Sequence, residues 1–181
     1  MTTVKGTALA IVFAPDQRAN LESDLAIAES IGSRLTGTFH PRSNSAVSVF
    51  SSILDCVRSA IAAVNWFTQT EEGMNGIGIG IDDDGNTESA LRLAERGLTN
   101  VSHNILLADT IFWRARNLPG VEFQEVVETV LPGHKGTNWI YSMTTQVGGF
   151  ADVIDAAVSD DTAGWDDEPP TAQGGAIANM D

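Results

Sequence analysis

The chain has 181 residues, of which 43% are hydrophobic, and a formal net charge of −14. This length and composition fit one domain with a hydrophobic core, and a surface so acidic repels phosphate backbones, so nucleic-acid binding is not expected. No apolar run reaches the roughly 20 residues that span a membrane. With no signal-peptide pattern at its start and a single cysteine, Cys56, the sequence predicts a cytoplasmic protein without membrane contact or an internal disulfide.

The first part of the chain carries strand patterns around one helix. An apolar run predicts a buried strand over 7–13. Asn20 can cap a helix that has apolar residues at helical spacing and ends near Gly32. Strands are then expected over 34–39 and 46–50, separated by a turn.

A second helix and a glycine-rich strand follow. Ser52 and Asp55 have capping-box spacing at the start of a helix that continues to Phe67. Cys56 lies on or beside the apolar face of that helix and is expected to be core. The segment 76–81 alternates glycine and isoleucine. This pattern predicts a strand whose glycine face lets a helix approach closely, and not a phosphate-binding loop.

The rest of the domain alternates helices and strands. A helix is expected from Asn86 or Thr87 to Arg96, a strand over 104–108, a helix over 109–116, and a closing hairpin of strands 121–130 and 139–143. This order predicts an α/β (α+β) fold, a ferredoxin-like βαββαβ sandwich with a C-terminal hairpin.

The acidic excess is concentrated at the C-terminus. The segment 144–181 holds 8 acidic residues and no Lys or Arg, against 16 acidic and 10 basic residues in the rest of the chain. The sequence therefore predicts a domain over 1–143 and an acidic tail over 144–181. Within the tail, 147–158 could form one short helix, and the Asp-, Gly- and Pro-rich residues from 159 onward are expected to be disordered.

Several blocks of the domain share their order and spacing with one known family. They are 10–13, 39–50 with the helix start after it, 78–81, 89–93, 104–108 and 122–143. In these blocks the chain resembles the catalytic domain of class III adenylate and guanylate cyclases. The resemblance implies the nucleotidyl-cyclase version of the sandwich. In that family, the 3′-hydroxyl of a nucleoside triphosphate attacks its own α-phosphate, helped by two metal ions held by two aspartates.

The resemblance places both metal positions on residues without a carboxylate. The first aspartate of the family should come two residues after Phe13, where this chain has Pro15, and the adjacent Asp16 is offset by one residue. The second belongs in a Gly-Asp-Gly turn, which here reads Ser-Asn-Ser around Asn44. One neutral amide cannot replace two carboxylates, so no metal cofactor is expected unless the chain is a divergent active enzyme.

The family's transition-state pair is only half retained. Arg92 stands at the arginine position, whereas Glu88 stands at the asparagine position, where a carboxylate would repel a triphosphate. A base-recognising lysine would align near His40. The family's long insertion before this helix is reduced to 82–87. An isolated helix arginine is more often a surface residue, here with Glu88 at i−4 as a candidate ion-pair partner, and that interpretation is preferred for Arg92.

Other candidate site residues have simpler interpretations. The aspartates 82–84 could bind a hard cation, but an acidic turn after a strand is usually solvated. His40, His103 and His134 show no metal-ligand spacing. His134 could contact an anion, but its place in a hairpin turn is the simpler account.

Three functional hypotheses result. The first is a catalytically degenerate cyclase-like domain that acts as a dimerising regulatory or binding module, paired with itself or with a related cyclase-fold chain, as the resemblance implies. The second is a divergent active cyclase that forms a cyclic nucleotide with Mg²⁺ or Mn²⁺. The third is a structural self-assembly domain. Pro15 and Asn44 favour the first over the second, and the sequence does not separate the first from the third. It also leaves the nucleotide open.

Overall fold

The computed structural model describes residues 6–32, 38–84, 86–98 and 105–145. The predicted tail helix and the predicted disorder after it lie outside these ranges, as do residues 34–37 of one predicted strand. No helix in the described part of the chain is both long enough and apolar enough to cross a bilayer.

The described residues form one mixed sheet with four α-helices and one short 3-10 helix. The strands are β1 (Thr7–Phe13), β2 (Thr38–Phe39), β3 (Ser45–Phe50), β4 (Ile77–Asp82), β5 (Ile105–Ala108), β6 (Val121–Val130) and β7 (Thr137–Thr145). The helices are α1 (Leu21–Gly32), α2 (Ile53–Thr68), α3 (Thr87–Leu98) and α4 (Asp109–Ala115), with the 3-10 helix η1 at Pro15–Gln17. The predicted order of elements is confirmed, and β7 is longer at both ends than the predicted 139–143.

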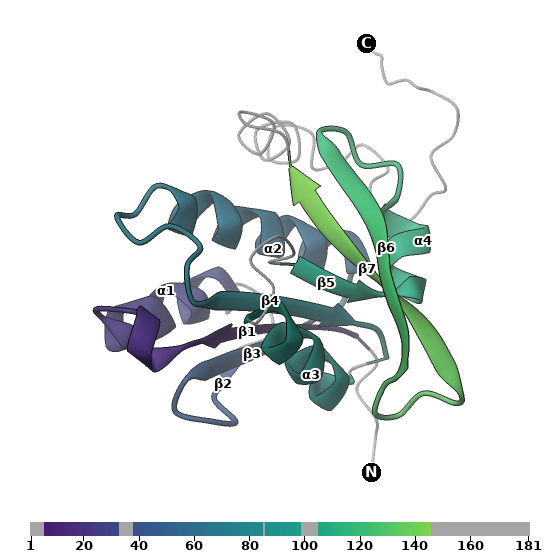
Figure 1. Ribbon diagram of the computed structural model, residues 1–181, viewed down its shortest axis with the longest axis horizontal. Helices are drawn as coiled ribbons and strands as arrows, with labels where there is room; N and C mark the ends of the chain where they lie inside the picture. Colours follow the sequence, from purple (N-terminus) through teal and green to yellow (C-terminus); the bar gives the residue numbers. More distant parts are fainter. Residues whose placement is uncertain (1–5, 33–37, 85, 99–104, 146–181) are drawn as a thin grey trace.

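The sheet has seven strands in the order β2-β3-β1-β4-β5-β7-β6 (Figure 1). All neighbouring strands are antiparallel except β4 and β5, which are parallel and are joined through α3. Strand β1 lies at the centre of the first part, between β3 and β4. The β6–β7 hairpin closes the other edge.

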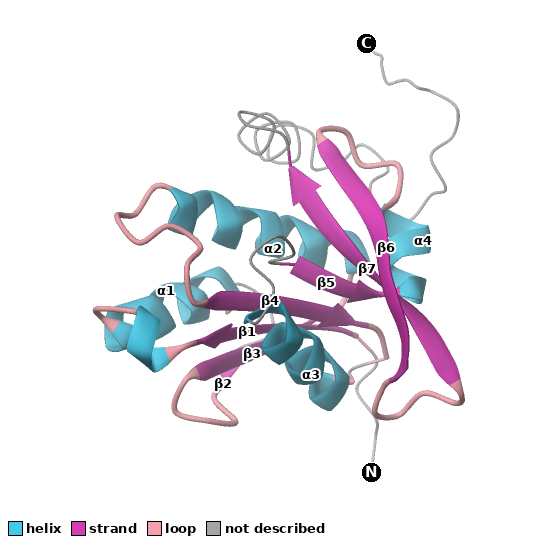
Figure 2. Cartoon of the chain, viewed as in Figure 1, coloured by secondary structure: helices cyan, strands magenta, loops and turns pink. Residues whose placement is uncertain are grey.

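Helices cover both faces of this sheet (Figure 2). Alternation along β1 divides the core, because successive side chains of a strand point to opposite faces. Leu9, Ile11 and Phe13 pack with residues of α1, α2 and α4. The smaller Ala8 and Ala10 pack with α3 on the other face. The predicted α/β class with a C-terminal hairpin is confirmed.

The glycine face of β4 lies directly against α3, as predicted from its alternation. A Cβ added to Gly78 would lie 2.0 Å from the carbonyl oxygen of Ala94, and one added to Gly80 would lie 2.1 Å from that of Ala90. Only glycine leaves room for the backbone of α3 at this distance. The close approach fixes α3 over the centre of the sheet.

Polar caps define where the helices begin. The Asn20 side chain accepts from the backbone N–H of Ser23 at 3.2 Å, and the Ser52 hydroxyl accepts from that of Asp55 at 3.3 Å. Both caps were predicted. A third, Asn86, accepts from the backbone N–H of Ser89 at 3.1 Å at the start of α3.

Candidate functional site

The two expected metal positions lie at the carboxyl end of β1. The backbone N–H of Phe13 donates to the carbonyl oxygen of Asn44 at 2.9 Å, and the Asn44 side-chain amide nitrogen donates to the carbonyl oxygen of Phe13 at 2.8 Å. The side chain of Asn44 therefore fastens the β2–β3 turn to the end of β1. The nitrogen of this amide is therefore used by the backbone, and the only ligand atom that the Asn44 side chain could offer is a neutral oxygen.

The first metal position belongs to an exposed turn. Pro15 begins the 3-10 helix η1, and both Pro15 and Asp16 are exposed. Proline has no side-chain oxygen, and its fixed φ suits the first position of such a helix. The local backbone at this corner is therefore explained by turn geometry alone.

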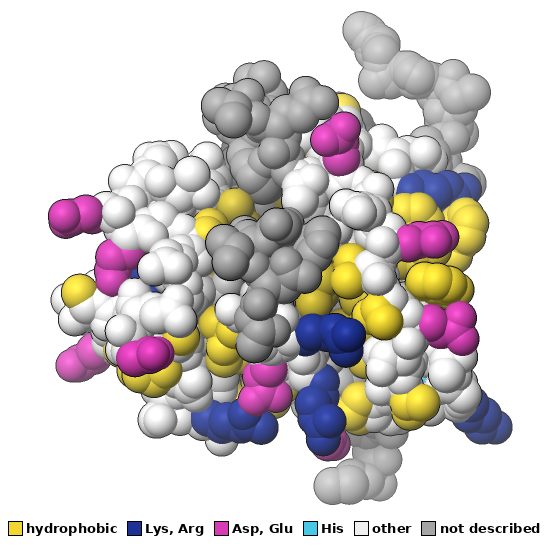
Figure 3. All heavy atoms as spheres, viewed as in Figure 1, with side chains coloured by type: hydrophobic (Ala, Val, Ile, Leu, Met, Phe, Trp, Pro, Cys, Tyr) yellow, Lys and Arg dark blue, Asp and Glu magenta, His cyan; other side chains and the backbone are white. Residues whose placement is uncertain are grey.

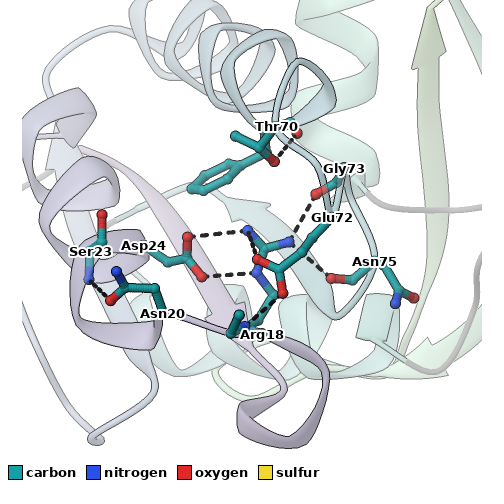
Figure 4. Close-up of polar contacts among 10 residues, drawn as sticks. Arg18, Asn20, Ser23, Asp24, Thr70, Glu72, Gly73 and Asn75 are labelled. Atoms are coloured by element: carbon teal, nitrogen blue, oxygen red, sulfur yellow. Dashed lines mark hydrogen bonds and ion pairs between the residues drawn. The ribbon is translucent and has the colours of Figure 1, made fainter.

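A buried arginine lies just beyond this turn. The Arg18 Nε and Nη2 atoms donate to the two carboxylate oxygens of Asp24 at 2.9 and 3.1 Å, and its Nη1 donates to the carbonyl oxygens of Gly73 and Asn75 (Figure 4). The Arg18 side chain is 1% exposed, and its guanidinium lies over the Phe67 ring. These contacts satisfy a buried charge from several sides, which is the condition for such a charge to be tolerated.

The same arginine joins three separate segments of the chain. Its partners come from α1 and from the loop after α2, and Glu72 of that loop also accepts from the backbone N–H of Ala19 at 2.6 Å. This cluster was not predicted. One signal was present in the sequence, because Asp24 interrupts the apolar stripe of α1 between Leu21 and Ala28. A carboxylate in that position is buried and needs a cationic partner.

The corner does not fit a pair of divalent cations. Pro15 supplies no side-chain oxygen, and Asn44, a neutral amide, directs its nitrogen toward Phe13. Mg²⁺ and Mn²⁺ prefer carboxylate and carbonyl oxygens. Within the described ranges, no group of three or more His, Cys, Asp or Glu side chains could hold a metal ion.

The β2–β3 turn that carries Asn44 is fastened at two further points. Arg42 forms an ion pair with Glu95 of α3. His40, the position near which a base-recognising lysine would align, contacts the carbonyl oxygen of Ser45 at 3.0 Å and the carboxylate of Glu29 at 3.3 Å. His40 therefore has structural partners in this chain.

The two α3 positions of the transition-state pair are both open to solvent. Arg92 and Glu88 are exposed, one helical turn apart. Their candidate ion pair is absent, and Arg92 forms no ion pair with any other described residue. Within the described residues, Arg92 therefore extends from α3 without a charged partner.

Asp82 is buried, so the prediction that residues 82–84 form a merely solvated acidic turn was wrong for this residue. Its side chain is 0% exposed, and one carboxylate oxygen lies 2.6 Å from Nε2 of His134, for which a hairpin turn was the preferred interpretation and an anion contact the alternative. The other oxygen accepts from the backbone N–H of Asp83 at 2.7 Å. The pair joins the end of β4 to the tip of the β6–β7 hairpin.

Burial raises the pKa of Asp82 above its usual value. The opposing influences are the Ser89 hydroxyl, His134 and the Asp83 backbone N–H, which favour the charged form and only partly offset burial. The buried Ser89 hydroxyl is near the carboxylate but outside hydrogen-bonding geometry. Burial likewise raises the pKa of the Cys56 thiol well above its usual value, so Cys56 is an inert core residue, as predicted.

A shallow groove of about 330 Å³ lies between α1 and α2. Its lining residues are Ile27, Ser30, Ile31, Ala62, Asn65, Trp66 and Gln69. None of these side chains titrates near neutral pH, so the groove offers no acid–base or nucleophilic chemistry.

No protein-family model matches the chain, and no curated protein matches it in sequence. Solved structures do match its fold. The catalytic core of a rhodopsin-guanylyl cyclase with converted specificity, in complex with ATPαS, is 14% identical with a TM-score of 0.56, covering 78% of this chain and 96% of that one.

Two further cyclases are similar over most of their length. An adenylate cyclase from Trypanosoma brucei, analysed in its monomeric state, is 12% identical with a TM-score of 0.53, covering 78% of this chain and 88% of that one. The adenylyl cyclase CyaB from P. aeruginosa is 12% identical with a TM-score of 0.52, covering 81% and 97%. At this level of identity, the similarity shows that the chain has the nucleotidyl-cyclase catalytic-domain fold.

Proposed function

We propose that this chain is a catalytically degenerate nucleotidyl-cyclase-like domain that acts as a dimerising regulatory or binding module. The observation that carries the proposal is the hydrogen bond from the Asn44 amide to the carbonyl oxygen of Phe13. An acidic ligand would be needed at this position for metal-assisted cyclisation. Here the side chain supports the backbone instead.

The other expected metal position supports the same proposal. Pro15 offers no side-chain ligand at the other expected metal position, and the adjacent Asp16 is offset by one residue in an exposed turn. No cofactor is therefore proposed for the module.

The proposed dimer is supported by the cyclase fold and by two exposed residues of α3. Arg92 and Glu88 lie exposed on its outer side without an ion pair to a described residue. The resemblance to the cyclase family implies a dimer with active sites at its interface, and both residues stand at positions of that family's transition-state pair. We propose that the chain pairs through it with itself or with a related cyclase-fold chain.

The test combines nucleotide binding with product analysis. The full chain is titrated calorimetrically with ATP, GTP, UTP and CTP in the presence of Mn²⁺, and each mixture is then separated by chromatography. Sedimentation velocity over a range of concentrations measures self-association. The proposal expects no cyclic nucleotide and no released pyrophosphate, together with a dimer formed by the chain alone or after mixing with a cyclase-fold partner.

Arg92→Ala and Lys135→Ala form a matched pair for this test. Both remove an exposed cation, from α3 and from the β6–β7 turn respectively. A cyclic nucleotide that disappears with Arg92→Ala but not with Lys135→Ala would establish a divergent active cyclase and overturn the proposal. A monomer without nucleotide affinity or partner would remove its dimerising and binding roles.

A further inference from the structure

The helix α4 presents an exposed tryptophan beside two exposed arginines. Trp113 is 56% exposed, the largest value among the exposed large aromatic side chains of the described residues. Its neighbour Phe112 is held against the core and stacks on Tyr141 at a centroid distance of 3.9 Å. Figure 3 shows hydrophobic side chains gathered beside a basic one in the region of α4 and β6. We call Trp113, Arg114 and Arg116 the α4 surface.

The two arginines of the α4 surface have no carboxylate partner within the described residues. Arg116 donates to the carbonyl oxygen of Trp113 at 2.6 Å and places its guanidinium over the Trp113 ring, 4.8 Å from the centroid. Arg114 is exposed. By contrast, three other arginines pair with carboxylates: Arg18, Arg42 and Arg58.

The charge of the α4 surface is local. Glu122 and Glu125 are exposed on the neighbouring strand β6, and Asp109 lies at the other end of α4. The positive charge is therefore confined to the last residues of α4 and the residue that follows it. A partner must bring its acidic groups to this small area, together with a group that can cover the indole of Trp113.

The C-terminal part of the same chain has this chemistry. Residues 160–168 read Asp-Asp-Thr-Ala-Gly-Trp-Asp-Asp-Glu, with Trp165 among five acidic residues and no basic residue between 146 and 181. We propose that the segment 160–168 binds the α4 surface of its own chain. Its carboxylates pair with Arg114 and Arg116, and Trp165 lies against Trp113.

The pairing of β6 with β7 places the end of β7, from which the chain leads to this segment, close to α4. Thr145, the last residue of β7, is paired with Val121 at the start of β6, and Val121 is five residues after Arg116. Five residues span at most about 18 Å. Fourteen residues separate Thr145 from the segment, and a chain of that length reaches at most about 50 Å when extended. The tether is therefore long enough to reach the α4 surface.

Because the segment is tethered to the same chain, weak contacts are sufficient to keep it bound to the α4 surface. Exposed ion pairs contribute only about 0.2–1 kcal/mol each. A short flexible linker, however, presents its segment at an effective concentration on the order of millimolar, so modest contacts can keep it bound. The inference is independent of the proposed function, because it concerns a face built from α4 and not the β1 corner or α3.

The test uses a nitroxide label on the tail of the full-length chain. Thr171→Cys introduces a thiol for labelling three residues after the segment, while the native Cys56 is 0% exposed and does not react. The chain has four tryptophans, so its ¹⁵N spectrum contains four indole N–H signals, assigned by single Trp→Phe variants. The ratio of each signal with oxidised and reduced nitroxide reports proximity to the tail.

The proposal expects the Trp113 indole signal to lose most of its intensity while that of Trp66 on α2 keeps it. The double variant Arg114→Glu with Arg116→Glu should restore the Trp113 signal, and high salt should do so in the parent chain. Lys135→Glu, a matched charge reversal at the exposed hairpin turn, should leave it broadened.

Three outcomes would overturn the proposal. The Trp113 signal could keep its intensity in the parent chain, which would mean that the tail is elsewhere. The broadening could survive reversal of both arginines, so that charge does not hold the segment. Finally, mixing ¹⁵N-labelled chains without nitroxide and unlabelled chains with nitroxide could reproduce the broadening, which would assign the contact to a second copy.

Discussion

Asn44→Asp exchanges the amide nitrogen that donates to Phe13 for a carboxylate oxygen, and so restores the acidic residue type of the cyclase pattern. The parent hydrogen bond is 2.8 Å long and partly buried. Its loss costs about 1 kcal/mol, and leaving the Phe13 carbonyl facing another acceptor adds about 1 kcal/mol more. The expected destabilisation is about 2 kcal/mol at pH 7. For a domain of this size, that corresponds to a fall in Tm of about 4–8 °C.

The loss of stability in Asn44→Asp should also depend on pH. The protonated form of the introduced carboxyl can donate to the Phe13 carbonyl, whereas the ionised form is repelled by it, so its pKa is higher in the folded than in the unfolded state. The folded variant therefore binds the proton more tightly. The destabilisation should be small near the ordinary carboxyl pKa of about 4 and reach its full value as pH rises through the higher folded pKa.

Urea unfolding followed by circular dichroism at several pH values measures this effect. Ser43→Asp is the matched control, because it adds the same charge at an exposed neighbouring position and should change stability by less than about 0.5 kcal/mol. Equal stability of Asn44→Asp and the parent chain at pH 7 would refute the role given to the amide. A midpoint of Asn44→Asp that rises with added Mn²⁺, while that of Ser43→Asp does not, would refute the conclusion that the corner rejects metal.

Two further predictions concern buried charges. Asp24→Ala leaves the guanidinium of Arg18 buried without its carboxylate and should lower the free energy of unfolding by about 3–5 kcal/mol. The double variant Arg18→Met with Asp24→Leu removes both charges and should cost clearly less. If urea unfolding shows the single variant to be as stable as the double, the ion pair is refuted. For Asp82, burial raises the pKa in the folded state, so this carboxyl favours folding at low pH and loses that contribution as pH rises through the folded pKa. The stability of the parent chain minus that of Asp82→Asn should therefore fall as pH rises from about 4 toward 7, and a constant difference in urea unfolding would contradict the assignment.

The helices, strands and caps were predictable from the sequence because they depend on residues that are close together in the chain. The apolar run of β1, the cap at Ser52 and the Gly–Ile alternation of β4 each predict a structure that the chain adopts. The alternation also predicted the close approach of α3, since a strand face without Cβ atoms admits a helix backbone. These signals involve residues a few positions apart, where backbone sterics and side-chain period decide the outcome.

The candidate site was only partly accessible to the same reasoning. The family resemblance implied that Pro15 and Asn44 stand at the metal positions, but the hydrogen bond from Asn44 to Phe13 depends on how β1 meets the β2–β3 turn. Arg18 was missed because its carbonyl partners lie more than 50 residues away. The one local signal, Asp24 within the apolar stripe of α1, does not identify which cation pairs with it.

The sequence by itself determined the order of helices and strands and the sheet-type fold class, because residue identity and short-range periodicity are sufficient for both. Tertiary structure alone decided which polar groups are buried and what each one contacts. Asp82 and His134 are 52 residues apart and carry no local sign of their 2.6 Å contact. They meet because the β6–β7 hairpin is placed by its pairing with β5, and the burial that raises the pKa of Asp82 comes from elements on both sides of that contact.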